Sequence, residues 1–374
     1  MLRRYLRVRN SIAPLLLGCS EPCSSRGASS SKAKKTERDR RPSWHRTALL
    51  ALGLFVSAAS GCAVQSQPPE RTQEATHRVQ EIRYVMGTLL DITLYAATEK
   101  DGRAQLNEAF LVAEKLDQTL STYKPESALT HFNENQSTSL VGVDPELYRM
   151  IAEAQKLSHE TAGAFDISIR PLVTMWEHAA ARGKAPTAED VKRASLLIGP
   201  HALRILPGNL VQKRSPVVQI ESGGIGKGIA VDAIIEKLRA LGVTRAFVDF
   251  GRSSIAAIGA PPQLDGWPVT LELREGVPDG ALSLRNETLT VSRAKGTPFI
   301  VAGVSYAHIF DPSTGYPVRT LRGAAIRSTS ATAGEAYVKY LVIRGAPPKR
   351  VVRGWHGARW IVRSEDTLQQ APNF

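Results

Sequence analysis

The long carboxy-terminal part of this chain contains no cysteine. The three cysteines, Cys19, Cys23 and Cys62, all lie within the first 62 of the 374 residues. A disulfide-stabilised domain needs paired cysteines, and the common structural zinc sites need several thiolates. The part of the chain after Cys62 therefore has neither a disulfide framework nor a cysteine metal site.

A hydrophobic run long enough to span a membrane is also missing. The apolar stretch at residues 47–59 has about a dozen apolar residues, whereas a membrane-spanning helix takes about 20. Arg40, Arg41 and Arg46 precede this stretch, and Ser60-Gly61-Cys62 follows it. A basic segment, a short apolar run and small residues, in that order, are typical of a secretory signal.

Cys62 needs an explanation of its own within this leader. Small residues directly before a cysteine resemble a bacterial lipobox, in which the cysteine is acylated and becomes the mature amino terminus; the alternative is an ordinary signal peptide with an incidental cysteine. We favour the lipoprotein because Cys62 would be the only cysteine of the mature chain. The sequence thus predicts a leader over 1–61, a lipid-anchored Cys62 with a flexible tether over 62–77, and a location on the periplasmic side of a bacterial cell envelope.

Acidic residues are too few to balance the basic ones, but the imbalance lies mainly in the leader. The net charge is +13, and residues 1–47 contribute +9 of it through twelve Arg or Lys against three acids. The remaining sequence has no basic stripe with interleaved aromatic residues, which a nucleic-acid-binding surface would require. We therefore exclude nucleic acid as a main partner.

The sequence from residue 78 onward mixes helical and strand patterns. The expected helices lie at 102–120, 145–160, 187–195, 227–241 and 332–343. The expected strands lie at 79–95, 217–221, 245–250, 255–258, 268–273, 281–284, 289–292, 324–330 and 359–362. The late strands look like antiparallel hairpins. We expect an α/β or α+β fold, with mixed sheets and flanking helices, in a single domain over 78–374 with two lobes.

The most informative stretch is residues 217–232, VVQIESGGIGKGIAVD. An expected strand leads into a glycine-rich turn and then a helix, whose first N–H groups and positive dipole end suit a phosphate. Lys227 adds a full charge at that point. The stretch is no P-loop, since Glu221 and Gly228 stand where glycine and Ser or Thr are needed, and no dinucleotide fingerprint, since Val231 replaces its last glycine. The residues alone indicate an anion or nucleotide site, or a tight turn whose glycines serve only close packing.

Five motifs in the same order resemble those of the FAD:protein FMN transferase (ApbE-like) family. They are MGT at 86–88, LSTY at 120–123, TAGAFD at 161–166, ESGGIGKGIAVD at 221–232 and HIFDPSTGYP at 308–317. The resemblance covers residues 78–374. One such motif is weak evidence, but five in the right order are specific.

The resemblance implies an enzyme that cleaves FAD, moves the FMN part onto a Thr hydroxyl of an acceptor protein and releases AMP. Such phosphoryl transfer depends on positioning and on neutralising phosphate charge, usually with Mg²⁺. By position, the resemblance assigns the flavin site to Met86, Tyr123, Ala164, Phe165, Asp166, Glu221, Lys227 and Ile309. It assigns catalysis to His308 and Glu335, and the metal to Gly224 and Glu335.

The chemistry of these side chains leaves some alternatives open. Asp166 or Glu221 can accept hydrogen bonds from a ribose or a base edge, and Lys227 can hold a diphosphate as a point charge. Phe165 and Tyr123 are equally suited to core or lid packing. His308 fits a structural turn residue better than a proton carrier.

The chain departs from the family pattern in the helix expected at 332–343. Family members place Asp there and, four residues later, Thr, so that both oxygens face one metal ion. This chain has Glu335 and Lys339, and an ammonium group cannot ligate Mg²⁺. The two residues are spaced for a surface ion pair worth about 0.2–0.5 kcal/mol. Arg252 and Arg293 also replace small residues, and would add positive charge near the metal position if both faced the site.

Three outcomes are consistent with these departures. In the first, Lys339 substitutes for the metal cation and the transferase activity persists. In the second, the protein binds flavin or an acceptor protein without turnover, and in the third it keeps only the fold and serves as an interaction scaffold. Met86, Lys227 and the turn at 164–166 favour flavin binding over the scaffold. The transferase is the function we predict.

Overall fold

The computed structural model describes residues 75–374, except for residues 275, 295–298, 320–321, 349–354, 356 and 365–366. The expected leader, Cys62 and nearly all of the tether lie outside the described residues. None of the described helices has both the length and the apolar character that crossing a membrane requires.

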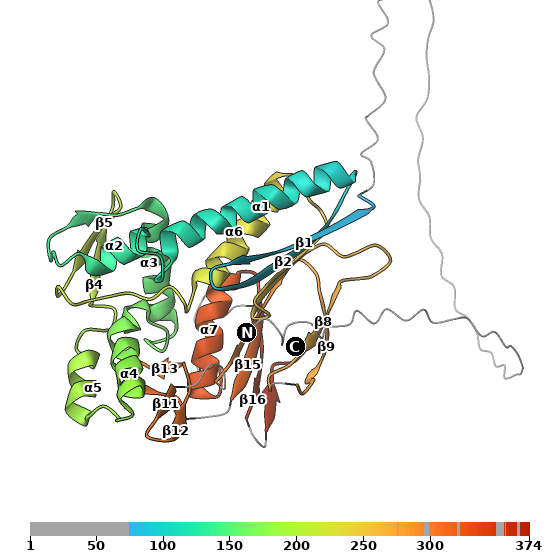
Figure 1. Ribbon diagram of the computed structural model, residues 1–374. Helices are drawn as coiled ribbons and strands as arrows, with labels where there is room; N and C mark the ends of the chain where they lie inside the picture. Colours follow the sequence, from blue (N-terminus) through green and yellow to red (C-terminus); the bar gives the residue numbers. More distant parts are fainter. Residues whose placement is uncertain are drawn as a thin grey trace, which may run out of the picture. The chain divides into compact units, whose positions relative to one another are not determined.

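An eight-stranded sheet runs through the centre of the fold (Figure 1). Its strands lie in the order β1, β2, β6, β7, β10, β15, β16, β17, and each is antiparallel to its neighbours. Their bounds are β1 His77–Val85, β2 Thr88–Ala96, β6 Ala246–Phe250, β7 Ser254–Ile258, β10 Thr288–Arg293, β15 Gly323–Ser328, β16 Arg359–Arg363 and β17 Leu368–Gln370. The predicted combination of sheets with flanking helices is confirmed.

Three helices cover one face of this sheet: α1 (Glu99–Leu120), α6 (Gly226–Ala240) and α7 (Ala331–Arg344) (Figure 1). Helix α7 packs on β10 and β15 and also against α6, so it is buried on most sides. Two glycines permit this close packing. A Cβ atom on Gly228 would lie 2.7 Å from the carbonyl oxygen of Ala331, and one on Gly334 would lie 2.4 Å from Thr290 Oγ1.

A hairpin of β8 (Trp267–Leu271) and β9 (Gly280–Leu284) covers the opposite face of the sheet. The Trp267 indole stacks on Phe247 with 5.5 Å between ring centroids. The central strands β7 and β10 are covered on both faces and are therefore buried along most of their length. Strand β7 carries the apolar run Ile255–Ile258, whereas β10 keeps an alternation of Thr with Leu and Val.

The second lobe contains α2 (Ala128–Glu134), α3 (Pro145–Glu160), α4 (Arg170–Arg182) and α5 (Ala188–Ser195) (Figure 1). A small sheet accompanies them, formed by β3 (Val141–Gly142), β5 (Leu210–Lys213) and β4 (Leu203–Leu206). Two short strand pairs complete this lobe. They are β11 (Phe299–Val301) with β12 (Val304–Tyr306), and β13 (Phe310–Asp311) with β14 (Tyr316–Pro317). Trp176 of α4 lies at the centre of a separate apolar cluster with Leu172 and Phe310.

The single strand expected at 79–95 is wrong, because this segment is the β1–β2 hairpin. Met86 and Gly87 form its two-residue turn with positive φ angles of 49° and 78°. Two such residues give the turn whose twist matches that of the flanking strands. The MGT motif therefore lies at the turn and the start of β2, not within one strand.

The strand expected at 217–221 is also wrong, because this extended segment pairs with a side chain instead of a strand. The N–H of Ile220 donates to Asn133 Oδ1 at 2.8 Å, and Asn133 Nδ2 donates to the Ile220 carbonyl at 2.9 Å. The N–H of Glu221 donates to the carbonyl of Ile167 at 2.7 Å. The segment is held in place without belonging to a sheet.

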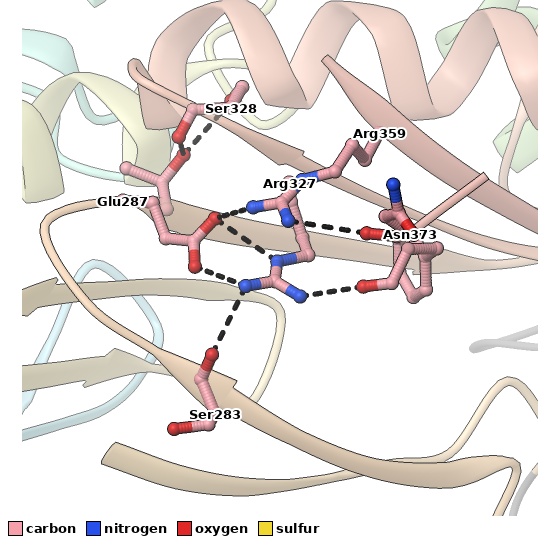
Figure 2. A network of polar contacts seen from close by, with 8 residues as sticks. Ser283, Glu287, Arg327, Ser328, Arg359 and Asn373 are labelled. Carbon is pink, nitrogen blue, oxygen red and sulfur yellow. Dashed lines mark hydrogen bonds and ion pairs between the residues drawn. The ribbon is translucent and has the colours of Figure 1, made fainter. Parts of the chain in front are cut away.

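A partly buried ion network joins the carboxy-terminal strands (Figure 2). Glu287 accepts hydrogen bonds from Arg327 of β15 and from Arg359 of β16. The Arg327 guanidinium also donates to the carbonyl oxygens of Ser283 at 3.1 Å and Phe374 at 2.6 Å. One carboxylate thus bridges two guanidinium groups, which in turn hold Asn373 and Phe374 against the sheet.

Candidate functional site

Two adjoining cavities open around the start of α6. The first, which we call the α7 cavity, has a volume of about 460 Å³ and is lined by residues 164–166, β10, residues 308–310 and α7. The second, the hairpin cavity, has a volume of about 870 Å³ and is lined by the β1–β2 turn and the end of α1. The two share one wall, formed by Tyr123, Glu221, Gly223, Lys227 and Ser253.

Every residue that the sequence assigned to the site lines one of these cavities, although the residues come from segments more than two hundred positions apart. Those on the α7 cavity are Ala164, Phe165, Asp166, Gly224, His308, Ile309 and Glu335. Met86 lines the hairpin cavity, and Tyr123, Glu221 and Lys227 line both. What these residues bind stays a prediction from the sequence.

The glycine-rich turn between Ile220 and α6 is fixed by its own polar groups. Ser222 donates its hydroxyl to the carbonyl of Leu120 at 2.6 Å, and its own carbonyl accepts from the N–H of Gly226 at 2.7 Å. Glu221 accepts from the N–H of Gly223 at 2.9 Å and from Arg170 at 3.2 Å. Its carboxylate is thus already engaged, although the sequence suggested it as a free acceptor.

Helix α6 begins at Gly226 without a side-chain cap. The N–H groups in the first turn of a helix have no partner within the helix, and they favour anions. Lys227 lies in this first turn, so the helix end and a side-chain ammonium face the same cavities. Gly228 serves helix packing, whereas Gly223 and Gly224 line the α7 cavity, where the binding of an anion stays a prediction.

Asp232, the last residue of the same motif, caps helix α7 instead of facing a cavity. Its Oδ2 accepts from the hydroxyl of Ser330 at 2.8 Å and from the N–H of Thr332 at 2.9 Å, and its Oδ1 accepts from the N–H of Ala331 at 2.8 Å. A carboxylate at this end of a helix satisfies free donors and complements the dipole. The motif therefore sets the position of α7 relative to α6.

Helix α7 places Glu335 and Lys339 on the wall of the α7 cavity. Glu335 Oε1 accepts from the hydroxyl of Ser254 at 2.5 Å, and Oε2 accepts from Lys339 Nζ at 2.5 Å. Lys227 Nζ lies 3.8 Å from Oε1. The predicted i,i+4 ion pair is confirmed, but its predicted surface position is wrong, because the side chains are only 4% exposed for Glu335 and 19% for Lys339.

The pKa values of this cluster follow from its burial and its charges. Burial would raise the pKa of Glu335, but Lys339 and Lys227, together with the hydrogen bonds from Lys339 and Ser254, outweigh it and lower that pKa. Burial lowers the pKa of Lys339, and Lys227 lowers it further, while Glu335 opposes both effects. Glu335 is thus an ionised acceptor between two lysines.

The pKa of His308 is lowered, which favours the neutral form of its ring. The residue as a whole is exposed, yet the protein atoms packed around its imidazole lower its pKa, and the charges of Lys339 and Lys227 lower it further. A neutral imidazole offers one acceptor nitrogen. The ring is therefore able to accept a proton from a group bound in the α7 cavity.

One carboxylate oxygen of Asp166, Oδ1, has a structural role. Its Oδ1 accepts from the N–H and the hydroxyl of Ser168 at 2.8 and 2.6 Å, which caps the short helix Ile167–Ile169. Within the described residues, Oδ2 is buried and has no hydrogen-bond partner. Burial raises the pKa of Asp166. Only Oδ2 remains for the ligand contact that the sequence suggested.

The two arginines that replace small residues go to different places. Arg293 lines the α7 cavity. Arg252 lines neither cavity, because its backbone takes a positive φ of 56° and its side chain, 68% exposed, extends to within 4.0 Å of Glu272. Arg293 alone meets the expectation of added positive charge at the site.

Tyr123, 88% exposed, lies at the rim where the cavities meet.

The residues around Glu335 do not fit a magnesium site. Both carboxylate oxygens are engaged by Ser254 and Lys339. A Cβ atom on Gly224 would lie 3.7 Å from Lys339 Cε, so the lysine side chain reaches from Glu335 to the other expected ligand. Mg²⁺ requires near-octahedral oxygen coordination, and the described residues hold no group of three or more His, Cys, Asp or Glu placed to bind a metal ion.

Sequence reasoning missed two polar residues that organise the site. Arg170 pairs with Glu221 and with Glu177 at the cavity wall, and Ser254 holds Glu335. Arg170 lies four positions after the TAGAFD motif, which was its only signal. Ser254 carries no local signal, because its partner is 81 positions away.

Comparison with known proteins gives a consistent result. The model of the ApbE family matches residues 86–353. The FAD:protein FMN transferase of Haemophilus influenzae is 25% identical over 281 residues, which cover 72% of this chain and 78% of that protein. The protein of the same name from Escherichia coli is 26% identical over 322 residues, covering 83% and 90%.

Solved structures share the fold. The ApbE protein from Thermotoga maritima superposes with a TM-score of 0.70 at 24% identity, covering 80% of this chain and 98% of that one. The flavin transferase ApbE from Vibrio cholerae gives 0.66 at 23% identity, covering 79% and 96%.

Proposed function

The chain belongs to the ApbE family, and from this membership we infer that it is a FAD:protein FMN transferase. The observation that carries this function is the convergence of all five motifs on two cavities that meet at Lys227. FAD consists of two nucleotide halves joined by a diphosphate. A cation on the shared wall suits the diphosphate, and a cavity on either side suits one half each.

We propose roles for the groups on the α7 cavity in this reaction. The hydroxyl of the acceptor Thr attacks the phosphorus of the FMN half, and the bond to the bridging oxygen breaks, so that AMP leaves. His308 accepts the proton of the attacking hydroxyl, which its neutral ring permits. Lys227 offsets the negative charge of the phosphates. Glu335 holds Lys339 and Ser254 in place, because both of its oxygens are already engaged.

We also propose that the mature protein is a lipoprotein anchored at Cys62 on the periplasmic side of the cell envelope. This proposal rests on residues 40–62 alone. Its test is metabolic labelling with an alkyne fatty acid in a bacterial host. Labelling of the wild type and none of Cys62→Ser supports the anchor, whereas equal labelling of both contradicts it.

The test of the transferase uses purified protein, FAD and an acceptor peptide with a flavinylation-type Thr, with AMP release and the mass of the peptide as readouts. We expect stoichiometric AMP and a peptide heavier by one FMN. Lys227→Met should reduce the rate at least 100-fold, because it removes a charge that offsets the developing phosphate charge. FAD binding without AMP release, with or without Mg²⁺, would identify a non-catalytic flavin binder. Absence of FAD binding would leave a scaffold with an inherited fold.

A further inference from the structure

The Glu335–Lys339 pair is difficult to explain as a stabilising contact. Both side chains are mostly buried, and removing charges from water costs free energy that their attraction seldom exceeds. Two apolar residues at these positions would serve the packing of α7 equally well. A buried ion pair on a cavity wall therefore calls for a role in the cavity itself.

The Lys339 ammonium has a donor left for a ligand. Of its three N–H groups, one donates to Glu335 Oε2 at 2.5 Å and one to the Glu335 carbonyl at 3.1 Å. Lys339 lines the α7 cavity, so the third N–H is available there. Within the described residues, Lys227 makes no hydrogen bond through Nζ, and it faces the same space.

The α7 cavity has a local excess of positive charge around Lys227 and Lys339, although its lining as a whole holds four basic residues (Arg170, Lys227, Arg293 and Lys339) and four acidic ones (Asp166, Glu177, Glu221 and Glu335). Glu335 compensates for one of the two lysines, and Glu221 is paired with Arg170. Lys227 or Lys339 therefore remains uncompensated, and Arg293 adds a further positive charge. The lysine stem also reaches to within 3.7 Å of where a Cβ atom on Gly224 would lie, so it occupies part of the space between the two expected metal ligands.

We propose that Lys339 replaces the divalent cation in this enzyme: Glu335 orients its ammonium, which binds a diphosphate oxygen together with Lys227. The enzyme then binds its nucleotide substrate without metal. This inference rests on the proposed function only in naming FAD as the substrate. The diphosphate site itself is defined by the two lysines.

The first experiment uses the full-length wild-type protein and follows FAD binding by the quenching of flavin fluorescence, in EDTA and in MgCl₂. We expect dissociation constants that agree within twofold. An affinity that rises tenfold or more with Mg²⁺ would overturn the inference, because it would show a metal site that the lysine does not replace.

The second experiment asks whether Lys339 itself contacts the ligand. In EDTA, Lys339→Thr should weaken FAD binding by 10- to 100-fold, the usual range for one charge-assisted hydrogen bond. Mg²⁺ should restore part of this loss, since the variant places a hydroxyl and a carboxylate one helical turn apart. Lys156→Thr is the matched control: it breaks an exposed ion pair with Glu153 on α3 and lies on neither cavity.

A double variant separates ligand binding from support of Glu335. Glu335→Gln with Lys339→Met removes both charges of the pair and leaves the net charge unchanged, although Lys227 loses the carboxylate 3.8 Å away. Thermal unfolding monitors its folding. We expect the same loss of FAD affinity as for Lys339→Thr. A folded double variant that binds FAD as the wild type does in EDTA would show that Lys339 serves only its neighbour, and would refute the proposal.

Titration with ADP distinguishes this inference from the proposed function. ADP carries a diphosphate without a flavin. If ADP binds in EDTA and Lys339→Thr weakens it while FAD does not bind, the transferase function fails and the lysine site stands. If neither ADP nor FAD binds the wild type in EDTA, the lysine site is refuted.

Discussion

Replacing Asp232 by Ala should damage both the stability of the protein and its ligand site. The carboxylate accepts three hydrogen bonds, from the hydroxyl of Ser330 and from the N–H groups of Ala331 and Thr332. The loss of a helix cap costs about 0.5–2 kcal/mol, and hydrogen bonds to a charged group contribute about 1.5–3 kcal/mol. Because Ser330 still caps α7 through Ala333, we expect about 2–4 kcal/mol of lost unfolding free energy.

The assay is urea unfolding followed by circular dichroism, together with FAD binding at a urea concentration of zero. Since α7 carries Glu335 and Lys339, a displaced helix end should also weaken FAD binding about tenfold, by analogy with the cost of small misplacements in active sites. Asp144→Ala is the matched control, because Asp144 caps α3 through Glu146 and Leu147 and lies on neither cavity. It should lower stability and leave FAD affinity unchanged. A folded Asp232→Ala protein with wild-type FAD affinity would refute the link between this cap and the site.

Three further predictions concern other parts of the fold. Glu287→Gln should lower the unfolding free energy by about 3–5 kcal/mol, because Arg327 and Arg359 lose their charged partner. Urea unfolding measures this loss, and a value below about 1 kcal/mol would contradict the prediction. Gly228→Ala should cost about 1–3 kcal/mol in the same assay, because its Cβ would meet the backbone of α7; a neutral effect would show that the helices shift freely. Burial lowers the pKa of Lys213 to about 8, so between about pH 8 and 10.5 the folded state binds fewer protons than the unfolded state. The unfolding free energy should therefore rise over that pH range in the wild type but not in Lys213→Met. Parallel pH profiles of the two proteins would contradict this prediction.

Local sequence signals were sufficient where the structure depends on local interactions. Helix α3 begins and ends at the predicted residues, Pro145 and Glu160, because Asp144 caps it and its apolar stripe is regular. Helix α5 begins one residue after the predicted start, because Thr187 is its cap rather than its first residue. The i,i+4 contact of Glu335 with Lys339 is equally local.

Non-local pairing explains the errors. A two-residue turn shifts the alternation by one residue, so odd-numbered residues point inward in β1 and even-numbered residues in β2. The polar Glu81 and Arg83 at inward positions of β1 made this shift hard to recognise in the pattern at 79–95. The apolar run at 217–221 has the composition of a strand, and only the fold shows that Asn133 is its partner. Helix α4 was missed because its first turn follows an irregular segment, although Pro171 suits a helix start.

Contacts between distant segments also limited what the sequence could predict about the site. Motif order predicted which residues would meet, but not the environment of their charges. Helix α7 is covered by β10, β15, α6 and α3 from several sides, and no pattern within residues 331–344 indicates which neighbours those are. The engagement of Glu221 by Arg170 and of Glu335 by Ser254 depends likewise on contacts between distant segments.

The cap of α7 by Asp232 has a consequence for the thermodynamics of ligand binding. Asp232 and Gly228 hold α6 directly against the start of α7, so contacts of the folded protein set the positions of Lys227 and Lys339 relative to each other. The entropy of ordering the two cations is then lost during folding and not when the ligand arrives. Binding of a diphosphate should therefore leave the protein backbone almost unchanged, and the ligand should contribute most of the conformational entropy that is lost.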